Sequence, residues 1–135
     1  MRSILADTGP LVALFKKGDR HHKGMVAWAE ANTVRLLTTW PVLTEACHFL
    51  SQDGKRGLFQ FIEAGGVTVA DIHVADLKGF AGIMAMYADR TVDLADASLV
   101  VLAERSGAAE IITIDRADFS TYRLSRNRPF IILFP

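Results

Sequence analysis

The stretch Ser3-Ile-Leu-Ala-Asp7-Thr8-Gly9-Pro10 decides the expected fold. A short apolar run closed by glycine and proline is typical of a strand buried on both faces. Gly9 permits a tight turn, and Pro10 suits the first turn of a following helix. Asp7 is therefore expected at the carboxyl end of the strand, which is where ligands bind in open parallel sheets.

The length and composition of the chain predict one compact domain spanning residues 1–135, because half of the residues are hydrophobic and supply a core. The 15 Lys and Arg balance the 15 Asp and Glu, which argues against a domain that holds nucleic acid by bulk electrostatics alone. Cys47 is the only cysteine, so no internal disulfide forms and a reducing compartment is favoured. No secretory signal or membrane-spanning run is visible, and we expect a cytoplasmic protein.

Apolar runs alternate with helical spacing along the rest of the chain. After the first strand, we expect strands at residues 36–39, 67–70, 110–115 and 130–134. Helices are expected at residues 11–15, from about 21 to 32, from 41 to about 51, and at 55–64, 73–88 and 93–105, with a break at Asp53-Gly54. This alternation predicts an α/β fold with right-handed crossovers and a mainly parallel sheet of four to five strands.

Two of these helices carry different burial patterns. The helix at 73–88 has residues spaced for burial on one face, namely Leu77, Phe80, Ala81, Met84 and Ala85. In the helix at 93–105 the apolar residues surround the axis, which predicts burial on all sides: Leu94, Leu99, Val100, Val101 and Leu102.

Two of the expected strands end in a carboxylate. Asp7 follows Ile4-Leu5-Ala6, and Asp115 follows the apolar run that begins at Ile111. If the two strands are neighbours, both side chains lie at the same edge of the sheet. Each aspartate alone is more simply explained as the cap of the next turn, but the pair favours a site.

Asp96 supplies the stronger argument. It lies angularly between Leu99 and Val100 on the helix expected to be buried, where an ionised carboxylate costs several kcal/mol unless a cation or donors compensate it. Asp93, three residues earlier, shares its face. A capping arrangement at the helix start explains Asp93 about as well as a functional role does, and explains Asp96 less well.

Glu45 is a further candidate, since it flanks the apolar stripe of the helix that begins near Pro41. No His has the spacing to a Cys or a second His that zinc sites use. Four or five converging carboxylates instead suit a hard cation such as Mg²⁺ or Mn²⁺. Such a cluster can activate a water and stabilise the departing oxygen in phosphodiester cleavage.

Taken in order, these motifs resemble the PIN-domain family, and within it the VapC-type toxins of toxin–antitoxin pairs. The resemblance covers nearly the whole chain and rests on four segments: Asp7-Thr8, Glu45, Asp93-Leu94-Ala95-Asp96-Ala97, and Thr113-Ile114-Asp115-Arg116-Ala117-Asp118-Phe119. It implies an α/β/α sandwich and a divalent-metal ribonuclease site formed by Asp7, Glu45, Asp96 and Asp115. Asp93 is a plausible additional carboxylate, and Thr8 and Thr113 match hydroxyl positions near the metal.

The resemblance also implies an RNA substrate, a homodimer and neutralisation by a cognate antitoxin protein. PIN domains serve in RNA processing outside toxin pairs as well, so that role is an alternative. A response-regulator receiver is less consistent with a chain that ends just after the fifth expected strand, and an aspartyl-nucleophile phosphatase would need a second aspartate where Gly9 stands. A non-catalytic binding module of the same fold would leave Asp96 unexplained.

Overall fold

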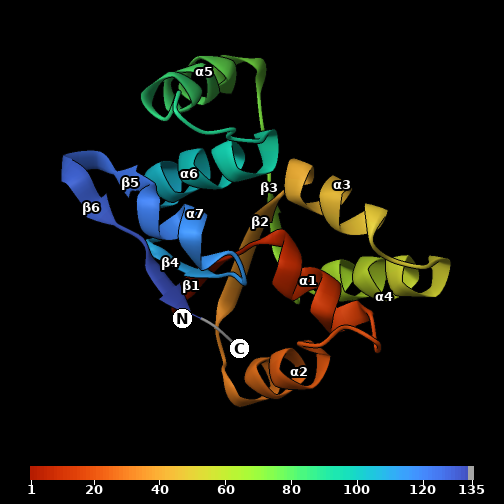
Figure 1. Ribbon diagram of the computed structural model, residues 1–135. Coiled ribbons are helices and arrows are strands. Elements are labelled where there is room, and N and C mark those ends of the chain that lie inside the picture. The colour runs from red at the N-terminus through yellow and green to blue at the C-terminus, as the bar shows by residue number, and fades with distance from the viewer. Residues whose placement is uncertain (134–135) are drawn as a thin grey trace.

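The computed structural model describes residues 1–133 and contains a five-stranded parallel sheet (Figure 1). In spatial order its strands are β3 (Thr68–Ala70), β2 (Arg35–Thr39), β1 (Ser3–Ala6), β4 (Glu110–Ile112) and β7 (Ile131–Leu133). The expected α/β class with a parallel sheet is confirmed. The fourth strand ends at Ile112 rather than at residue 115, and position 134 of the fifth expected strand lies outside the described residues.

β1 is the central strand, as its sequence predicts. Ile4, Leu5 and Ala6 have no exposed surface, because a strand with neighbours on both edges and helices on both faces meets no solvent. Leu5 pairs with Leu37 of β2 on one side and with Ile111 of β4 on the other. The strands that precede Asp7 and Asp115 are therefore direct neighbours.

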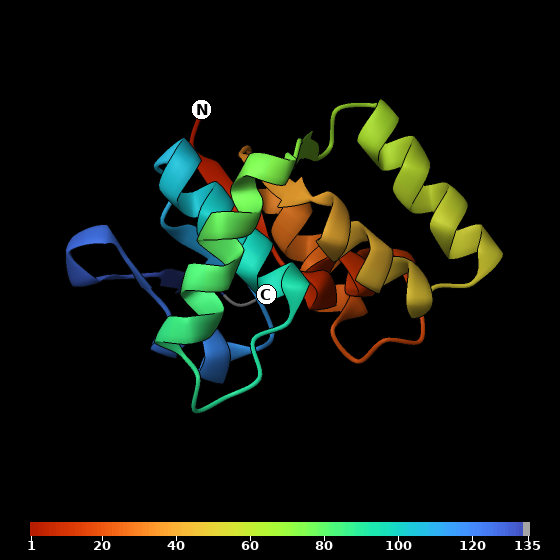
Figure 2. The ribbon, with the colours of Figure 1, turned by 90° about the horizontal axis from the view of Figure 1, so that it is seen from above.

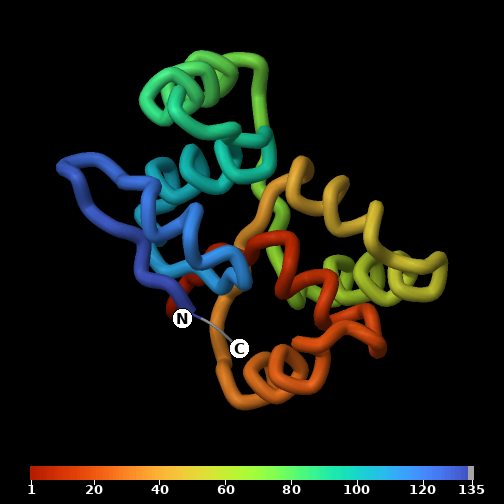
Figure 3. Tube along the Cα trace, in the orientation of Figure 1, coloured from red at the N-terminus to blue at the C-terminus, as the bar shows by residue number. Residues whose placement is uncertain are grey.

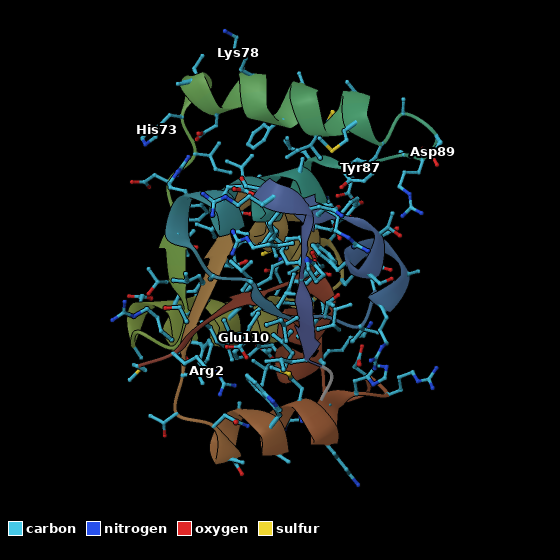
Figure 4. The ribbon with its side chains drawn as sticks, turned by 90° about the vertical axis from the view of Figure 1, so that its left-hand side faces the viewer. Arg2, His73, Lys78, Tyr87, Asp89 and Glu110 are labelled. Atoms are coloured by element: carbon cyan, nitrogen blue, oxygen red, sulfur yellow. The ribbon has the colours of Figure 1, made fainter. Side chains whose placement is uncertain are left out.

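Seven α-helices connect and cover these strands in the described part of the chain. They are α1 (Thr8–Phe15), α2 (His22–Ala31), α3 (Trp40–His48), α4 (Gln52–Glu63), α5 (Leu77–Met86), α6 (Leu94–Ser106) and α7 (Arg116–Thr121). In Figures 1 and 4, α5 and α6 lie above the sheet and α2 lies below it. Near the sheet in Figure 4, Arg2 forms an ion pair with Glu110 of β4, with 2.9 Å between Nε and Oε1.

The predicted break at Asp53-Gly54 is wrong, because both residues lie in the first turn of α4. Ser51 caps this helix by accepting a hydrogen bond from the Gly54 amide at 3.1 Å. Gly54 is buried, and a Cβ there would lie 2.8 Å from the Phe15 carbonyl oxygen. The glycine therefore allows α4 to approach the end of α1 closely and does not end a helix.

Helix α5 differs most from expectation. A short 3₁₀ helix (Val74–Asp76) precedes it, and of the five residues expected to be buried only Phe80 is. Leu77 is 55% exposed and Met84 is 38% exposed. The reason is visible in Figure 2: α5 lies on α6, and no other described element covers its outer side. Lys78 points outward from this side in Figure 4.

Helix α6 is buried along most of its length, as predicted, although Leu94 at its start is 49% exposed. It packs against β2, α3 and α5. Gly107 ends it in the left-handed conformation at φ 79°, a conformation that glycine adopts without a steric penalty.

The region between β4 and β7 was not anticipated from the sequence. It forms α7 and a small antiparallel hairpin of β5 (Arg123–Leu124) and β6 (Arg128–Pro129), which projects at the left of Figure 3. These elements are too short for hydrophobic periodicity to reveal them. No helix in residues 1–133 combines the length and apolar character needed to cross a membrane.

Candidate active site

A pocket of about 380 Å³ lies at the carboxyl ends of β1 and β4. Its lining residues are Asp7, Thr8, Gly9, Val12, Asp19, Glu45, Phe49, Asp93, Asp96, Ile114 and Asp115. Six of these carry a carboxylate and none is Lys, Arg or His. The fold therefore brings acidic side chains from five separate segments of the chain to one pocket.

Every acidic residue proposed from the sequence lines this pocket. Asp7 and Asp96 are buried at its base, Glu45 is half-buried, and Asp93 and Asp115 are exposed at its rim. Of the two proposed hydroxyl residues, Thr8 lines the pocket, and Thr113 lies behind it and is fully buried.

Asp7 is held by two hydrogen bonds that fix both of its oxygens. The Thr8 amide donates to Oδ1 at 2.8 Å, and the Thr113 hydroxyl donates to Oδ2 at 2.7 Å. Burial raises the pKa of Asp7 to about 6, and the charges of Glu45 and Asp115 add to this while the two hydrogen bonds oppose it. The carboxylate is thus oriented but electrostatically uncompensated.

Asp96 is the second buried carboxylate. Burial raises its pKa to about 8, with repulsion from Asp7 and Asp93 adding to the shift. The Tyr122 hydroxyl donates to its Oδ2 at 2.8 Å and partly offsets that cost. Burial together with this hydrogen bond raises the pKa of Tyr122, so the phenol remains a protonated donor at neutral pH.

Asp93 and Asp115 each cap a helix as well as lining the pocket. Asp93 Oδ1 accepts from the Asp96 amide at 2.8 Å at the start of α6, and Asp115 Oδ1 accepts from the Asp118 amide at 3.3 Å at the start of α7. The capping explanation therefore holds for both residues. It does not hold for Asp96, whose carboxylate is bound by Tyr122 rather than by the backbone of its own helix.

Glu45 reaches the pocket from α3, and a buried hydroxyl pair fixes that helix against α6. Ser98 donates to the Ala95 carbonyl at 2.7 Å, and its oxygen lies 2.6 Å from Thr39 Oγ1. Thr39 also caps α3 through the Val42 amide. The two helices that carry Glu45 and Asp96 are thus tied together beside the site.

Sequence reasoning missed Asp19 and Tyr122. Asp19 lies in the turn between α1 and α2, within a predominantly basic stretch that conceals it, and its only local signal is an Asx turn in which it accepts from the His21 amide at 2.9 Å. Tyr122 lies 26 residues from Asp96, and no spacing rule connects the two.

The donor set fits a hard divalent cation. All polar side chains that line the pocket present oxygen, and Thr8 Oγ1 is buried without a hydrogen-bond partner among the described residues. Among residues 1–133 no three His, Cys, Asp or Glu side chains are close enough together to hold a metal ion as they stand. A cation held by three or more of these carboxylates would therefore require them to move closer together.

A larger cavity of about 690 Å³ lies elsewhere, between α3 and α4. Its lining is mainly apolar and includes Trp40, Leu43, Phe59 and Ile62. Because Glu63 is the only carboxylate in its lining, the cavity does not compete with the acidic pocket as a candidate centre of catalysis.

Comparison with known proteins gives a consistent result. The family model of the PIN domain matches residues 4–123. Ribonuclease VapC26 of Mycobacterium tuberculosis (strain ATCC 25618 / H37Rv) is 26% identical over 124 residues, covering 89% of this chain and 92% of that protein. The resemblance found in the motifs is thereby confirmed.

Two solved structures share the fold. The crystal structure of Mycobacterium tuberculosis VapC20, described as a Sarcin-Ricin loop cleaving toxin, has a TM-score of 0.76 at 17% identity and covers 84% of this chain and 91% of its own. The crystal structure of VapBC2 from Rickettsia felis, bound to a DNA fragment from their promoter, has a TM-score of 0.63 at 12% identity and covers 98% of each chain.

Proposed function

Because the chain belongs to the PIN-domain family, we propose that it is an endoribonuclease that depends on Mg²⁺ or Mn²⁺ and acts as the toxin of a type II toxin–antitoxin pair. The observation that carries this proposal is the pocket lined by six carboxylates and no cationic side chain. Keeping such a cluster in a folded protein is costly unless a cation occupies it. The similarity to ribonuclease VapC26 supports RNA as the substrate.

The residues divide into three roles. Asp7 and Asp96, at the base of the pocket, would hold the cation together with Glu45 and Asp115, and Asp93, which lines the same pocket, is the candidate for a further ligand. The Thr113 hydroxyl orients Asp7, and the partnerless Thr8 hydroxyl is available to a water or to the cation. When bound, the cation would supply Lewis acidity that activates water and neutralises charge on the departing oxygen.

In the proposed hydrolysis, the oxygen of a water bonds to phosphorus and the bond from phosphorus to the departing sugar oxygen breaks. Of the four carboxylates that would hold the cation, exposed Asp115 and half-buried Glu45 are more open to solvent than Asp7 and Asp96, and one of these two accepts the proton of the attacking water. The departing oxygen leaves with a proton from solvent. The buried carboxylates keep their positions throughout, because each is fixed by a hydroxyl donor.

A non-catalytic binding module of the same fold is a weaker explanation. It would leave no reason for Asp96 to be 9% exposed on a buried helix with two other carboxylates facing it. A PIN nuclease of RNA processing has the same site, and only the partner separates it from a toxin.

Two partners are proposed. The structural likeness to VapBC2 supports a cognate antitoxin. The exposed apolar residues of α5, including Leu77 and Met86, support a homodimer through this helix, on a surface that the antitoxin also uses. Burying such residues in an interface is favourable by about 25 cal/mol per Å² of apolar surface.

The test is cleavage of mixed cellular RNA by the purified protein with Mn²⁺, with Mg²⁺ and with chelator. We expect fragments only with metal, and a melting temperature that rises with metal because a ligand of the folded state stabilises it. If millimolar metal produces no thermal shift and no heat of binding, the proposal is rejected. Suppression of cleavage by the product of a small upstream open reading frame separates a toxin from an RNA-processing enzyme.

A further inference from the structure

The buried hydroxyl of Tyr122 is a side-chain donor that binds the Asp96 carboxylate directly. It donates to Asp96 Oδ2 at 2.8 Å, and Tyr122 itself has no exposed surface. We propose that Tyr122 is a positioning residue of the cation site, which holds the Asp96 carboxylate turned toward the pocket. This inference rests on the proposed function, because it assigns Asp96 to a cation.

The ring of Tyr122 is immobilised, so its hydroxyl has a fixed position. Phe119 meets it edge-on at 5.3 Å between centroids, and Tyr87 meets it edge-on at 5.2 Å. Phe130 in turn packs edge-on against Phe119 at 5.4 Å. A hydroxyl whose ring packs against two others restrains the carboxylate that it binds more than a mobile surface donor would.

Asp96 needs such restraint because the charges around it act to displace it. Its backbone is fixed by the helix and by the Asp93 cap, but its side chain experiences repulsion from Asp7 and Asp93. The Asp7 carboxylate is restrained in the same way, because it accepts a hydrogen bond from the Thr113 hydroxyl at 2.7 Å. Each buried carboxylate of the pocket thus has its own hydroxyl donor, and partners of this kind orient metal-binding carboxylates.

The test compares two variants that each remove one phenol oxygen from the same aromatic cluster. Tyr122→Phe removes the donor to Asp96 and keeps the ring. Tyr87→Phe is the matched control, because the Tyr87 hydroxyl accepts from the Arg123 amide at 2.8 Å and binds no carboxylate. The affinity for Mn²⁺ alone is measured by titration calorimetry, and the unfolding free energy is measured in chelator.

We expect Tyr122→Phe to weaken Mn²⁺ binding by about tenfold, the lower end of the effect of removing a residue that orients a metal ligand. Its kcat for RNA should fall while KM is unchanged, and Tyr87→Phe should bind Mn²⁺ as the wild type does. In an Asp96→Asn background, Tyr122→Phe should cause no further loss of affinity, since the partner it positions is already changed.

The outcomes separate the two proposals. A wild-type protein that does not bind Mn²⁺ overturns the proposed function. A wild-type protein that binds Mn²⁺, with Tyr122→Phe binding it equally well or Tyr87→Phe losing as much affinity, overturns only the role of Tyr122. If Tyr122→Phe is unfolded in chelator, the variant Phe119→Leu is used in its place. This change loosens the packing of the Tyr122 ring and keeps the Tyr122 hydroxyl. A loss of Mn²⁺ affinity in Phe119→Leu supports the proposal, and wild-type affinity overturns it.

Discussion

Helices α5 and α6 pack against each other and are both rich in apolar residues, yet solvent reaches them very differently. In α5 only Phe80 is buried, whereas α6 is buried from Ala95 to Val100 and again at Leu102 and Ala103. The charged residues are not distributed as this difference in burial would suggest. The exposed helix has Lys78 as its one charged residue, and the buried helix carries Asp96 in its core-facing first turn.

Each helix therefore contains residues that the folded monomer does not need. Exposed Leu77 and Met86 contribute little to its stability, and buried Asp96 opposes it. Residues that work against stability are expected at functional sites, because function retains them. We therefore expect chemistry at the start of α6 and an interface on α5, and the predictions that follow test these two proposals.

The largest effect is expected from Asp96→Asn. Cleavage of RNA should fall by more than about 100-fold, the upper end of the effect of losing a residue that only orients a metal ligand, because a buried carboxylate of the proposed cation site is lost. In chelator the variant should be as stable as the wild type or more stable by about 1 kcal/mol, since one of the repelling charges is removed. The Asn oxygen still accepts the Tyr122 hydroxyl. RNA cleavage assays and chemical denaturation measure the two effects.

Asp53→Asn is the matched control for this prediction. Asp53 lies in the first turn of α4 as Asp96 does in α6, but it is exposed and forms an ion pair with Arg56. We expect wild-type cleavage and a stability change within about 0.5 kcal/mol. An Asp96→Asn protein that is less stable in chelator and cleaves RNA normally would reject the metal-nuclease role of Asp96.

The next effect concerns packing. Leu99→Ala in α6 should cost about 3 kcal/mol of unfolding free energy, because it opens a cavity at a fully buried position. Leu77→Ala makes the same chemical change in α5 at a side chain that is 55% exposed, and should cost the monomer less than about 0.5 kcal/mol. Urea denaturation of the two variants checks the contrast, and similar losses would mean that α5 is covered within the monomer.

The same contrast shows how far the sequence alone can predict this fold. Ile4-Leu5-Ala6 predicted a buried strand correctly, because a run without polar residues has only one environment that suits it. The spacing in α5 predicted a buried face incorrectly. Helical periodicity says which residues share a face, but whether another element covers that face depends on the tertiary arrangement.

The candidate site follows a similar division. Asp7, Asp96 and Asp115 were predicted because strand ends and a buried helix restrict where their side chains lie. Asp19 and Tyr122 come from the turn after α1 and from the end of α7. No local feature links either residue to the site, because their places there arise only when segments distant in sequence meet at the pocket.

A smaller effect is expected from pH. Raised carboxylate pKa values mean that folded Asp7 and Asp96 bind protons which the unfolded chain has released, so the metal-free protein should lose stability as pH rises from about 4 to 8. We expect a loss of roughly 2 kcal/mol between pH 5 and pH 6 in chelator, because both groups contribute in that window and one pKa unit corresponds to about 1.4 kcal/mol for each. Denaturation of the wild type and of Asp96→Asn measures it.

In that experiment the variant should show a shallower dependence on pH, because one of the two titrating groups is gone. Mn²⁺ at pH 8 should restore stability to the wild type by binding the folded state. A metal-free protein that becomes more stable from pH 5 to pH 8 would contradict the electrostatic account of the pocket.

The smallest effect on the monomer, and the sharpest test of α5, is expected from Leu77→Ser combined with Met86→Ser. Both side chains are more than half exposed, so replacing them should change the unfolding free energy of the monomer by less than about 0.5 kcal/mol. If α5 forms the proposed homodimer, the same change removes apolar surface from the interface, and light scattering should show a monomer at concentrations where the wild type is a dimer.

Phe59→Ser is the control for this prediction, because Phe59 is 49% exposed on α4 beside the apolar cavity. A dimer that survives the α5 double variant and dissociates with Phe59→Ser would move the interface from α5 to the cavity between α3 and α4. Exposed apolar residues would then have indicated an interface correctly but on the wrong helix.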